Sequence, residues 1–144
     1  MCRHCDYASF LEASGLGHTP NRQRVLEAIG NHGRPLSAQQ IFETLSRSDN
    51  INRVTVYRIL DLLVDNGLVE RISGGGRSFV YGPAPNENHP AHPHFYCRSC
   101  GNLECLNPRS LNVDLQPMQG SFPGLIENVE VRVDGVCKNC LASA

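Results

Sequence analysis

The stretch NRVTVYRILDLLVDNG, residues 52–67, predicts a helix at the centre of the N-terminal half of the chain. Apolar residues recur through it at the spacing of one helical face, and Gly67 stands where the helix would end. The residues expected to be buried are Val56, Ile59, Leu60, Leu63 and Val64. Near the amino end this leaves Arg53, Thr55, Tyr57 and Arg58, and we expect at least three of these side chains to face away from the core.

Two more helices are expected before this one, and a hairpin after it. Residues 19–33 open with Thr-Pro and close with glycine, which is typical of the two ends of a helix. Residues 36–48 begin with a Ser-x-x-Gln capping box. Residues 68–73 and 77–82 alternate in polarity around three glycines, which favours a β-hairpin. Three helices followed by a hairpin predict a winged helix-turn-helix.

In such a domain the second helix of the turn lies in the DNA major groove, with its amino end against the base edges. Arg53, Thr55, Tyr57 and Arg58 fall at that end. The alternative is an ordinary helical bundle, in which these residues are merely exposed and Tyr57 is half-buried. The net charge of -1 excludes a protein that binds nucleic acid by bulk positive charge. A few arginines on one face remain compatible with DNA binding.

The sequence divides near residue 83. The segment GPAPNENHPAHP, residues 82–93, contains four prolines and no aliphatic side chain larger than alanine. We therefore expect a winged-helix domain over residues 1–82, a hinge over 83–93 and a second domain over 94–144. The first residues lack the apolar core of a secretory signal, and no later run approaches the roughly 18 apolar residues of a membrane span. These features predict a cytoplasmic protein without a membrane partner.

Two C-x-x-C pairs dominate the C-terminal segment. Each pair can place two sulfurs on one side of a tight turn, so Cys97, Cys100, Cys137 and Cys140 together make a tetrahedral, structural zinc site. Incidental thiols and a redox dithiol are the alternatives. The segment has about 50 residues, fewer than the roughly 70–80 at which a hydrophobic core alone suffices. A metal that holds the domain together is therefore expected.

The rest of this segment predicts a small α/β domain, so that the chain as a whole is α+β. Residues 94–97 and 125–135 alternate and favour strands, with Val129, Val131 and Val133 on one face. A short helix is compatible with residues 107–122. A sheet with an apolar face and so little cover is expected to bury that face against a second copy of the chain. We expect a homodimer.

The order of these motifs resembles the ferric uptake regulator (Fur) family of bacterial metal-sensing repressors. The resemblance rests on the segments 19–29, 36–42, 54–71, 94–101 and 135–140, and it covers nearly the whole chain. It implies a winged helix that binds double-stranded operator DNA, a C-terminal dimerisation domain, a four-cysteine zinc and a regulatory metal site at the hinge. It also implies that Tyr57 and Arg58 lie at the DNA, with Arg22 contacting its backbone. No phosphate loop or nucleophile elbow is present, and we do not expect an enzyme.

The resemblance places the regulatory site around His94. Cys105 stands five residues after Cys100, where many relatives carry a carboxylate ligand, and His92 and His89 could join it. The alternative is that Cys105 binds no metal and is a small buried hydrophobic residue. Other family ligand positions are replaced here, by Pro35, Tyr81 and Val129, and the HxD pattern of the accessory site reads Ala-His-Pro at residues 91–93. One regulatory site rather than two is therefore expected.

A thiolate beside imidazoles favours Zn²⁺ over Fe²⁺ as the regulatory metal and argues against an all-nitrogen/oxygen peroxide-sensing iron site. Fe²⁺ is the next candidate, followed by nickel and manganese. The N-terminal Cys2, His4 and Cys5 either belong to a frayed terminus or fold over to complete this site. A different class of function also stays open, in which Cys2, Cys5 and Cys105 report oxidation in a zinc-stabilised protein.

Overall fold

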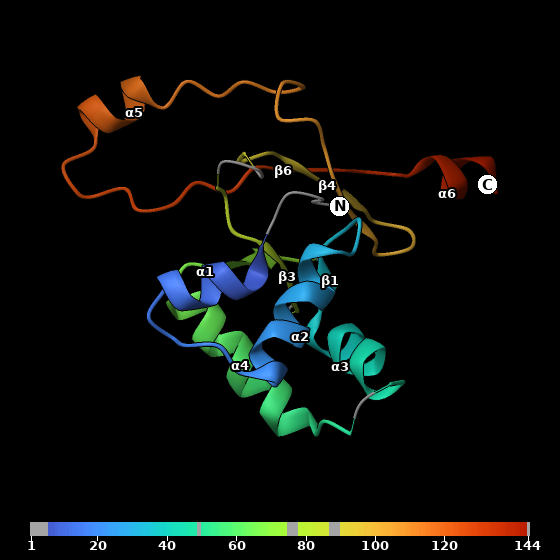
Figure 1. The fold of residues 1–144 in the computed structure, drawn as a ribbon. Coiled ribbons are helices and arrows are strands. Elements are labelled where there is room, and N and C mark those ends of the chain that lie inside the picture. The colour runs from blue at the N-terminus through green and yellow to red at the C-terminus, as the bar shows by residue number, and fades with distance from the viewer. Residues whose placement is uncertain (1–5, 49, 75–77, 87–89, 144) are drawn as a thin grey trace. The chain divides into compact units, whose positions relative to one another are not determined.

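The structure is a computed structural model that describes residues 6–48, 50–74, 78–86 and 90–143. The chain forms two compact units, residues 1–91 and residues 92–144. Figure 1 labels the elements of each. None of the described helices has the length and apolar character needed to cross a lipid bilayer.

Four helices build the first unit: α1 (Tyr7–Ala13), α2 (Pro20–Gly30), α3 (Ala38–Ser46) and α4 (Arg53–Asp65). The three expected helices are confirmed, and each begins at a side-chain cap. Thr19 accepts a hydrogen bond from the backbone of Arg22, and Asn52 accepts one from that of Thr55. At α3 both bonds of the capping box form between Ser37 and Gln40. These caps satisfy backbone N–H groups that the helices leave without partners.

Helix α1 was not expected from the sequence. Asp6 caps it through the backbone N–H of Ser9, and Tyr7 and Leu11 are buried. Its docking depends on a glycine in α2, because a Cβ added at Gly30 would lie 2.0 Å from Oη of Tyr7. The Tyr7 ring therefore occupies the space that any larger residue at position 30 would fill.

A three-stranded antiparallel sheet completes this unit, in the order β1-β3-β2. Strands β2 (Val69–Ser73) and β3 (Phe79–Pro83) form the expected hairpin, whose tip at residues 75–77 lies outside the described residues. The short strand β1 (Leu36–Ser37) was not expected. Arg71 lies over the rings of Phe79 and Tyr81 and forms an ion pair with Asp61 of α4, which ties the hairpin to that helix.

The core of the first unit is formed mainly by the four helices. It contains every residue of α4 that the helical pattern placed inside except Val64, which is only partly buried against it. The buried apolar residues of the helices are Tyr7, Leu11, Val25, Leu26, Ile29, Ile41, Leu45, Val56, Ile59, Leu60 and Leu63. Burial of these side chains is the main stabilising contribution in this unit.

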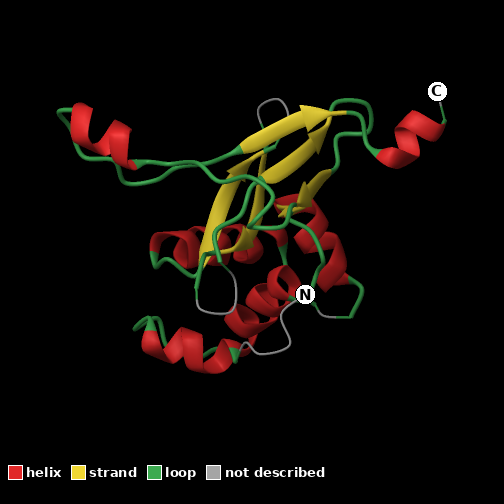
Figure 2. Ribbon diagram, turned by 90° about the horizontal axis from the view of Figure 1, so that it is seen from above, coloured by secondary structure: helices red, strands yellow, loops and turns green. Residues whose placement is uncertain are grey.

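The second unit is a small sheet with little cover. Strands β4 (His94–Cys97), β5 (Leu103–Cys105) and β6 (Arg132–Gly135) form it in the order β5-β4-β6, with β5 antiparallel and β6 parallel to β4. Helix α6 (Lys138–Ala142) follows β6. Helix α5 (Gln116–Ser121), drawn red in Figure 2, lies within the long segment between β5 and β6, and Figure 1 shows it away from β4 and β6.

The strand expected over residues 125–135 is too long. Only residues 132–135 pair with β4, and Val129 precedes them as exposed chain. Alternation of valines predicted the extended backbone, but the strand begins only where β4 offers a hydrogen-bonding partner. Side chains that would form an apolar face are exposed in the single chain, among them Phe122, Leu125, Val129 and Val133.

Candidate metal centres and nucleic-acid interface

The four paired cysteines meet because two neighbouring strands are parallel. Cys97 is the last residue of β4, directly opposite Gly135 at the end of β6, and Cys137 follows two residues later. Parallel strands bring their carboxyl ends to one edge of a sheet. The turn after β4 contains Gly101 with φ of 78°, a left-handed conformation that favours glycine. Cys137 then begins helix α6, which carries Cys140.

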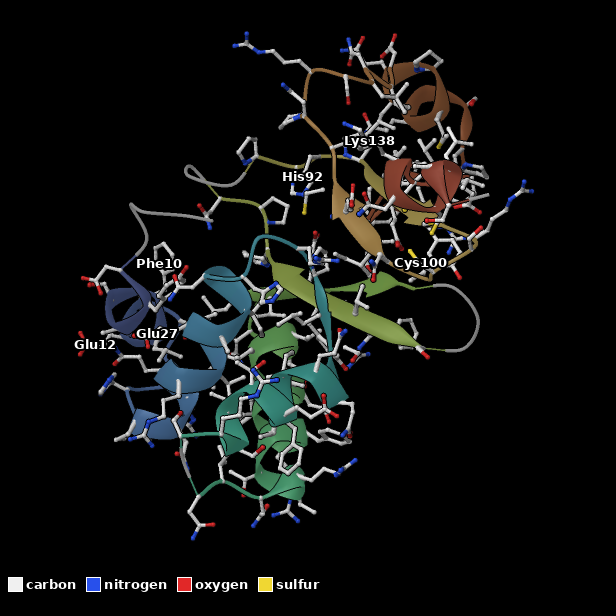
Figure 3. The ribbon with its side chains drawn as sticks, turned by 90° about the vertical axis from the view of Figure 1, so that its right-hand side faces the viewer. Phe10, Glu12, Glu27, His92, Cys100 and Lys138 are labelled. Carbon is white, nitrogen blue, oxygen red and sulfur yellow. The ribbon has the colours of Figure 1, made fainter. Side chains whose placement is uncertain are left out.

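The sulfurs have the spacing of a metal-ligand set. All four Sγ atoms lie within 4.8 Å of one another, and those of Cys100 and Cys137 are 3.9 Å apart. A tetrahedron with Zn–S bonds of about 2.3 Å has sulfurs roughly 3.8 Å apart. Figure 3 shows Cys100 beside α6. The residues therefore fit a zinc ion bound by four thiolates, with no open position for a substrate.

The thiols already interact with one another and with the backbone. The backbone N–H of Cys137 donates to Sγ of Cys97 at 3.3 Å. This bond and another from the backbone of Cys100 lower the pKa of Cys97 to about 6. Hydrogen bonds with Cys137 and Cys100 raise the pKa of Cys140 to about 12. A bound Zn²⁺ would deprotonate the whole set, because a coordinating thiol loses its proton to the metal.

A second group of potential ligands lies at the other end of β4. Donor atoms of His92, His94 and Cys105 are all within 4.8 Å of one another. His94 is directly opposite Cys105 in the antiparallel register of β4 and β5, and His92 lies two residues before it on the same side of the chain. Cys105 is exposed. In the single chain Cys105 is therefore accessible and is not packed in the core as a small hydrophobic residue.

The two imidazoles form the inner part of this group. Their ring centroids are 4.6 Å apart, His94 is 4% exposed and Nε2 of His92 is buried. Burial lowers the pKa of His94 to about 4, with a contribution from His92, and Glu130 acts in the opposite direction. His94 is thus neutral near pH 7, the form that binds metals. Two imidazoles and one thiol fit zinc better than a hard cation.

Some of the expected ligands cannot be placed. His89 lies outside the described residues, and so do Cys2, His4 and Cys5. His92 was expected to join His94 and Cys105, and the structure brings the three residues together. The pairing register of β4 and β5 brings these residues together. The register of two strands cannot be read from residue spacing alone.

The predicted DNA-binding residues fall into two groups. Tyr57 and Arg58 are exposed in the first turns of α4, and Thr55 is half-buried. Arg53 instead lies 4.8 Å from the centroid of the Phe42 ring and donates a hydrogen bond to Gln39, so it links α4 to α3. Sequence reasoning missed Val54, which is 58% exposed and one helical turn before Arg58.

Arg22 also makes contacts within the chain. Its guanidinium donates to the carbonyl oxygens of Leu16 and Gly17, in the loop between α1 and α2. Arg22 and Arg53 therefore stabilise the helical unit, whereas Tyr57 and Arg58 project from α4. The residues predicted to bind DNA therefore include some that make contacts within the helical unit and some that project from α4.

Comparison with known proteins agrees with this architecture. The chain is 29% identical over 132 residues to the peroxide-responsive repressor PerR of Staphylococcus aureus, covering 90% of this chain and 86% of the relative. The ferric uptake regulator of Vibrio cholerae has a TM-score of 0.73 at 23% identity, covering 92% of this chain and 100% of that one. A zinc uptake regulator solved with zinc and DNA has a TM-score of 0.66 at 21% identity, covering 94% and 91%.

The family model of the ferric uptake regulators matches residues 13–118. That range spans α2 to α4, the hairpin, the first cysteine pair and Cys105. The chain belongs to the ferric uptake regulator family and is a metal-responsive transcriptional regulator.

Proposed function

We propose that this protein is a zinc-responsive repressor that binds operator DNA as a homodimer in the cytoplasm. The observation that carries the proposal is the presence of two separate ligand groups in the second unit. The four-cysteine group is complete by itself. The group of His92, His94 and Cys105 is then available for a metal whose occupancy changes with supply.

The two groups differ in ways that suit these two roles. Four thiolates close the coordination sphere of the first, and Cys97 is completely buried, so its metal exchanges slowly. The second group is reached through the exposed Cys105, and two of its three members are neutral imidazoles. A metal bound there would link β4 to β5, because His94 and Cys105 would both coordinate it.

The metal acts by selecting a conformation. A ligand shifts an equilibrium only as far as it binds one state more tightly than the other. We infer that the occupied regulatory site favours the state of the dimer that binds DNA. The exposed apolar side chains of the second unit would be buried between the two copies, which supports dimerisation there.

On the DNA side, α4 has the form of a recognition helix. Tyr57 and Arg58 project near its amino end, and Arg53 holds it against α3. Arginine bound to guanine, or an apolar contact to a thymine methyl, is the usual form of readout at such a position. The proposed role of Arg53 is to position the helix, and that of Arg58 is to contact DNA.

Zinc is favoured by the chemistry of Cys105. Its sulfur is a soft ligand, and sulfur with imidazole binds zinc better than iron(II) or manganese. Iron(II) is the next candidate. A direct test first selects a DNA site from a random pool. Zinc, iron(II), nickel or manganese is then added in turn to protein that retains its structural zinc, and binding to the selected DNA is measured. We expect zinc to promote binding at the lowest free concentration, and a protein that binds equally without added metal would contradict the proposal.

A second candidate function is regulation by thiol oxidation. It is favoured by the exposure of Cys105 and by the similarity of the chain to a peroxide-responsive repressor of Staphylococcus aureus. The two functions differ in what changes DNA affinity. A metal sensor responds to zinc under reducing conditions, whereas a thiol switch loses binding with peroxide, recovers with a reductant and is indifferent to added zinc.

A further inference from the structure

Val54 is an apolar residue that lies exposed in the first turn of α4. Its side chain is 58% exposed, and no other large apolar side chain in the described part of the first unit is as exposed. We propose that Val54 is a specificity-determining residue that contacts the 5-methyl group of a thymine in the operator. This inference rests on the proposed function, because it requires α4 to lie in the major groove of DNA.

The geometry of α4 directs Val54 away from the core. Val56, Ile59, Leu60 and Leu63 form the buried face of this helix. At about 100° per residue, the side chain of Val54 lies roughly opposite the centre of that face. Burial of this side chain therefore requires another molecule.

The neighbours of Val54 on the exposed face are the two residues proposed to contact DNA. Tyr57 is three residues later and Arg58 is four residues later, and residues at these separations are neighbours on a helix surface. Around the helix, Val54 lies between them. Single exposed apolar residues are common on protein surfaces. The indication of a DNA contact is therefore the position of Val54 between Tyr57 and Arg58, and not its exposure alone.

The charges along the exposed face show which part of α4 suits a DNA contact. Arg58 is in the amino-terminal half of the helix, whereas Asp61 and Asp65 are exposed in the carboxyl-terminal half. The helix dipole adds partial positive charge at the amino end. Phosphates are therefore attracted to the first turns of α4, which contain Val54, and repelled by the later ones.

A thymine methyl is the group in the major groove that an aliphatic side chain can recognise. Thymine is distinguished there by its 5-methyl group, and an apolar contact reads it. Valine has no hydrogen-bonding group in its side chain, so it cannot read the donors and acceptors of the other bases. Its branched Cβ favours one rotamer in a helix, and little side-chain freedom is lost when Val54 packs against a methyl group.

Replacing thymine by deoxyuridine removes the proposed contact without changing the protein. The full-length protein, with zinc at saturation, first selects an operator from random DNA. Each thymine of that operator is then changed to deoxyuridine, one position at a time, and affinity is measured for the wild type, Val54→Ala and Leu62→Ala. Leu62 is the matched control, because it is an apolar residue of the same helix that is 36% exposed, two turns further from the amino end. Alanine favours helix at exposed positions, and circular dichroism checks that both variants fold.

We expect deoxyuridine at one position to weaken wild-type binding about fourfold, the effect of one methyl-sized group losing its apolar contact. Val54→Ala should lose most of this discrimination, because its shorter side chain does not reach the methyl group, and Leu62→Ala should keep it. Unchanged wild-type affinity at every deoxyuridine, or wild-type discrimination in Val54→Ala, would overturn the assignment. If discrimination is lost in Tyr57→Ala but kept in Val54→Ala, the tyrosine reads the methyl group and the assignment is equally wrong. A wild-type protein that selects no preferred sequence contradicts the proposed function itself.

Discussion

The two units of this chain are held together by different means. In the first, buried apolar side chains run through all four helices and continue into β1 and β2. In the described part of the second, buried apolar residues are few: Pro93, Cys97 and Leu103, and Cys97 is a candidate metal ligand. Side-chain burial stabilises the helical unit. The small sheet buries few apolar side chains in the single chain, which is why we propose that a metal and a second copy of the chain stabilise it.

The difference also separates the functions of the units. In the helical unit, α4, the proposed recognition helix, is capped by Asn52 and packed against the core of the same unit. Both groups of metal ligands lie in the second unit, at the two ends of β4. Metal can therefore alter the second unit strongly while leaving the recognition helix itself unchanged.

The largest effect is expected from breaking the four-cysteine site. Cys97→Ser should remove a zinc that mild chelators leave in place, because one neutral hydroxyl replaces a buried thiolate. The binding free energy of a structural zinc is on the order of 10 kcal/mol, and losing it should unfold the second unit and abolish the dimer. Metal analysis and analytical ultracentrifugation measure both results.

The helical content of this Cys97 variant sharpens the comparison. Most of the helix lies in the first unit, so far-ultraviolet circular dichroism should retain most of its signal. A Cys97→Ser protein that stayed dimeric and kept its zinc would show that the second unit does not depend on this site.

The matching experiment on the helical unit is Gly30→Ala. The added methyl would overlap Tyr7, so α1 must shift or detach. Overpacking of this kind costs about 1–3 kcal/mol of unfolding free energy. Gly33→Ala is the control, since a Cβ there meets nothing within 4 Å. Denaturant unfolding should show a loss for Gly30→Ala alone, and a smaller loss when Tyr7→Ala is already present. Equal stability of both glycine variants would contradict the described docking of α1.

A substitution at a DNA-contacting residue of the first unit should lower DNA affinity without changing the binding of either metal. Arg58→Ala is expected to cost about 1–3 kcal/mol of operator affinity if the guanidinium binds a guanine. If it binds phosphate instead, all sequences should weaken alike and the salt dependence should become shallower. Both metal contents should stay at the wild-type level. Wild-type binding by the Arg58 variant would remove this residue from the interface.

The smallest effect is expected at Tyr57. Tyr57→Phe removes one hydroxyl from a side chain that is 38% exposed and should relax base selectivity only modestly. Selection from random DNA by the two proteins would measure this. A strong loss of affinity at every sequence would assign Tyr57 to the stability of α4 instead.

Local signals in the sequence predicted most of the helical unit. Thr19 and Ser37 are caps at the helix starts that the sequence predicted, and apolar spacing identified the buried face of α4. Helix α1 was missed because seven residues give too few turns for a periodic pattern. The position of Arg53 in α4 did not reveal that its side chain contacts Phe42 and Gln39 of another helix, and its predicted DNA contact stays a prediction.

The second unit was predictable where its ligands are close in sequence. The C-x-x-C spacing identified the four-cysteine group, since each half is a local turn. The approach of His94 to Cys105 depends on which residues of β4 and β5 stand opposite one another. Strand register is set by the whole sheet, so residue spacing alone did not predict this approach, and Cys105 and His94 were indicated by the family resemblance.

The central claim is that metal at the group of His92, His94 and Cys105 controls DNA binding separately from the structural zinc. Its most direct test is a zinc titration of operator binding by the wild type and by Cys105→Ser, both holding their structural zinc. The variant should need at least tenfold more free zinc, a shift of about 1.4 kcal/mol, while its affinity at saturating zinc and its dimer stay near those of the wild type. If the two titration curves coincide, the cysteine is not a regulatory ligand and the account of this site is wrong.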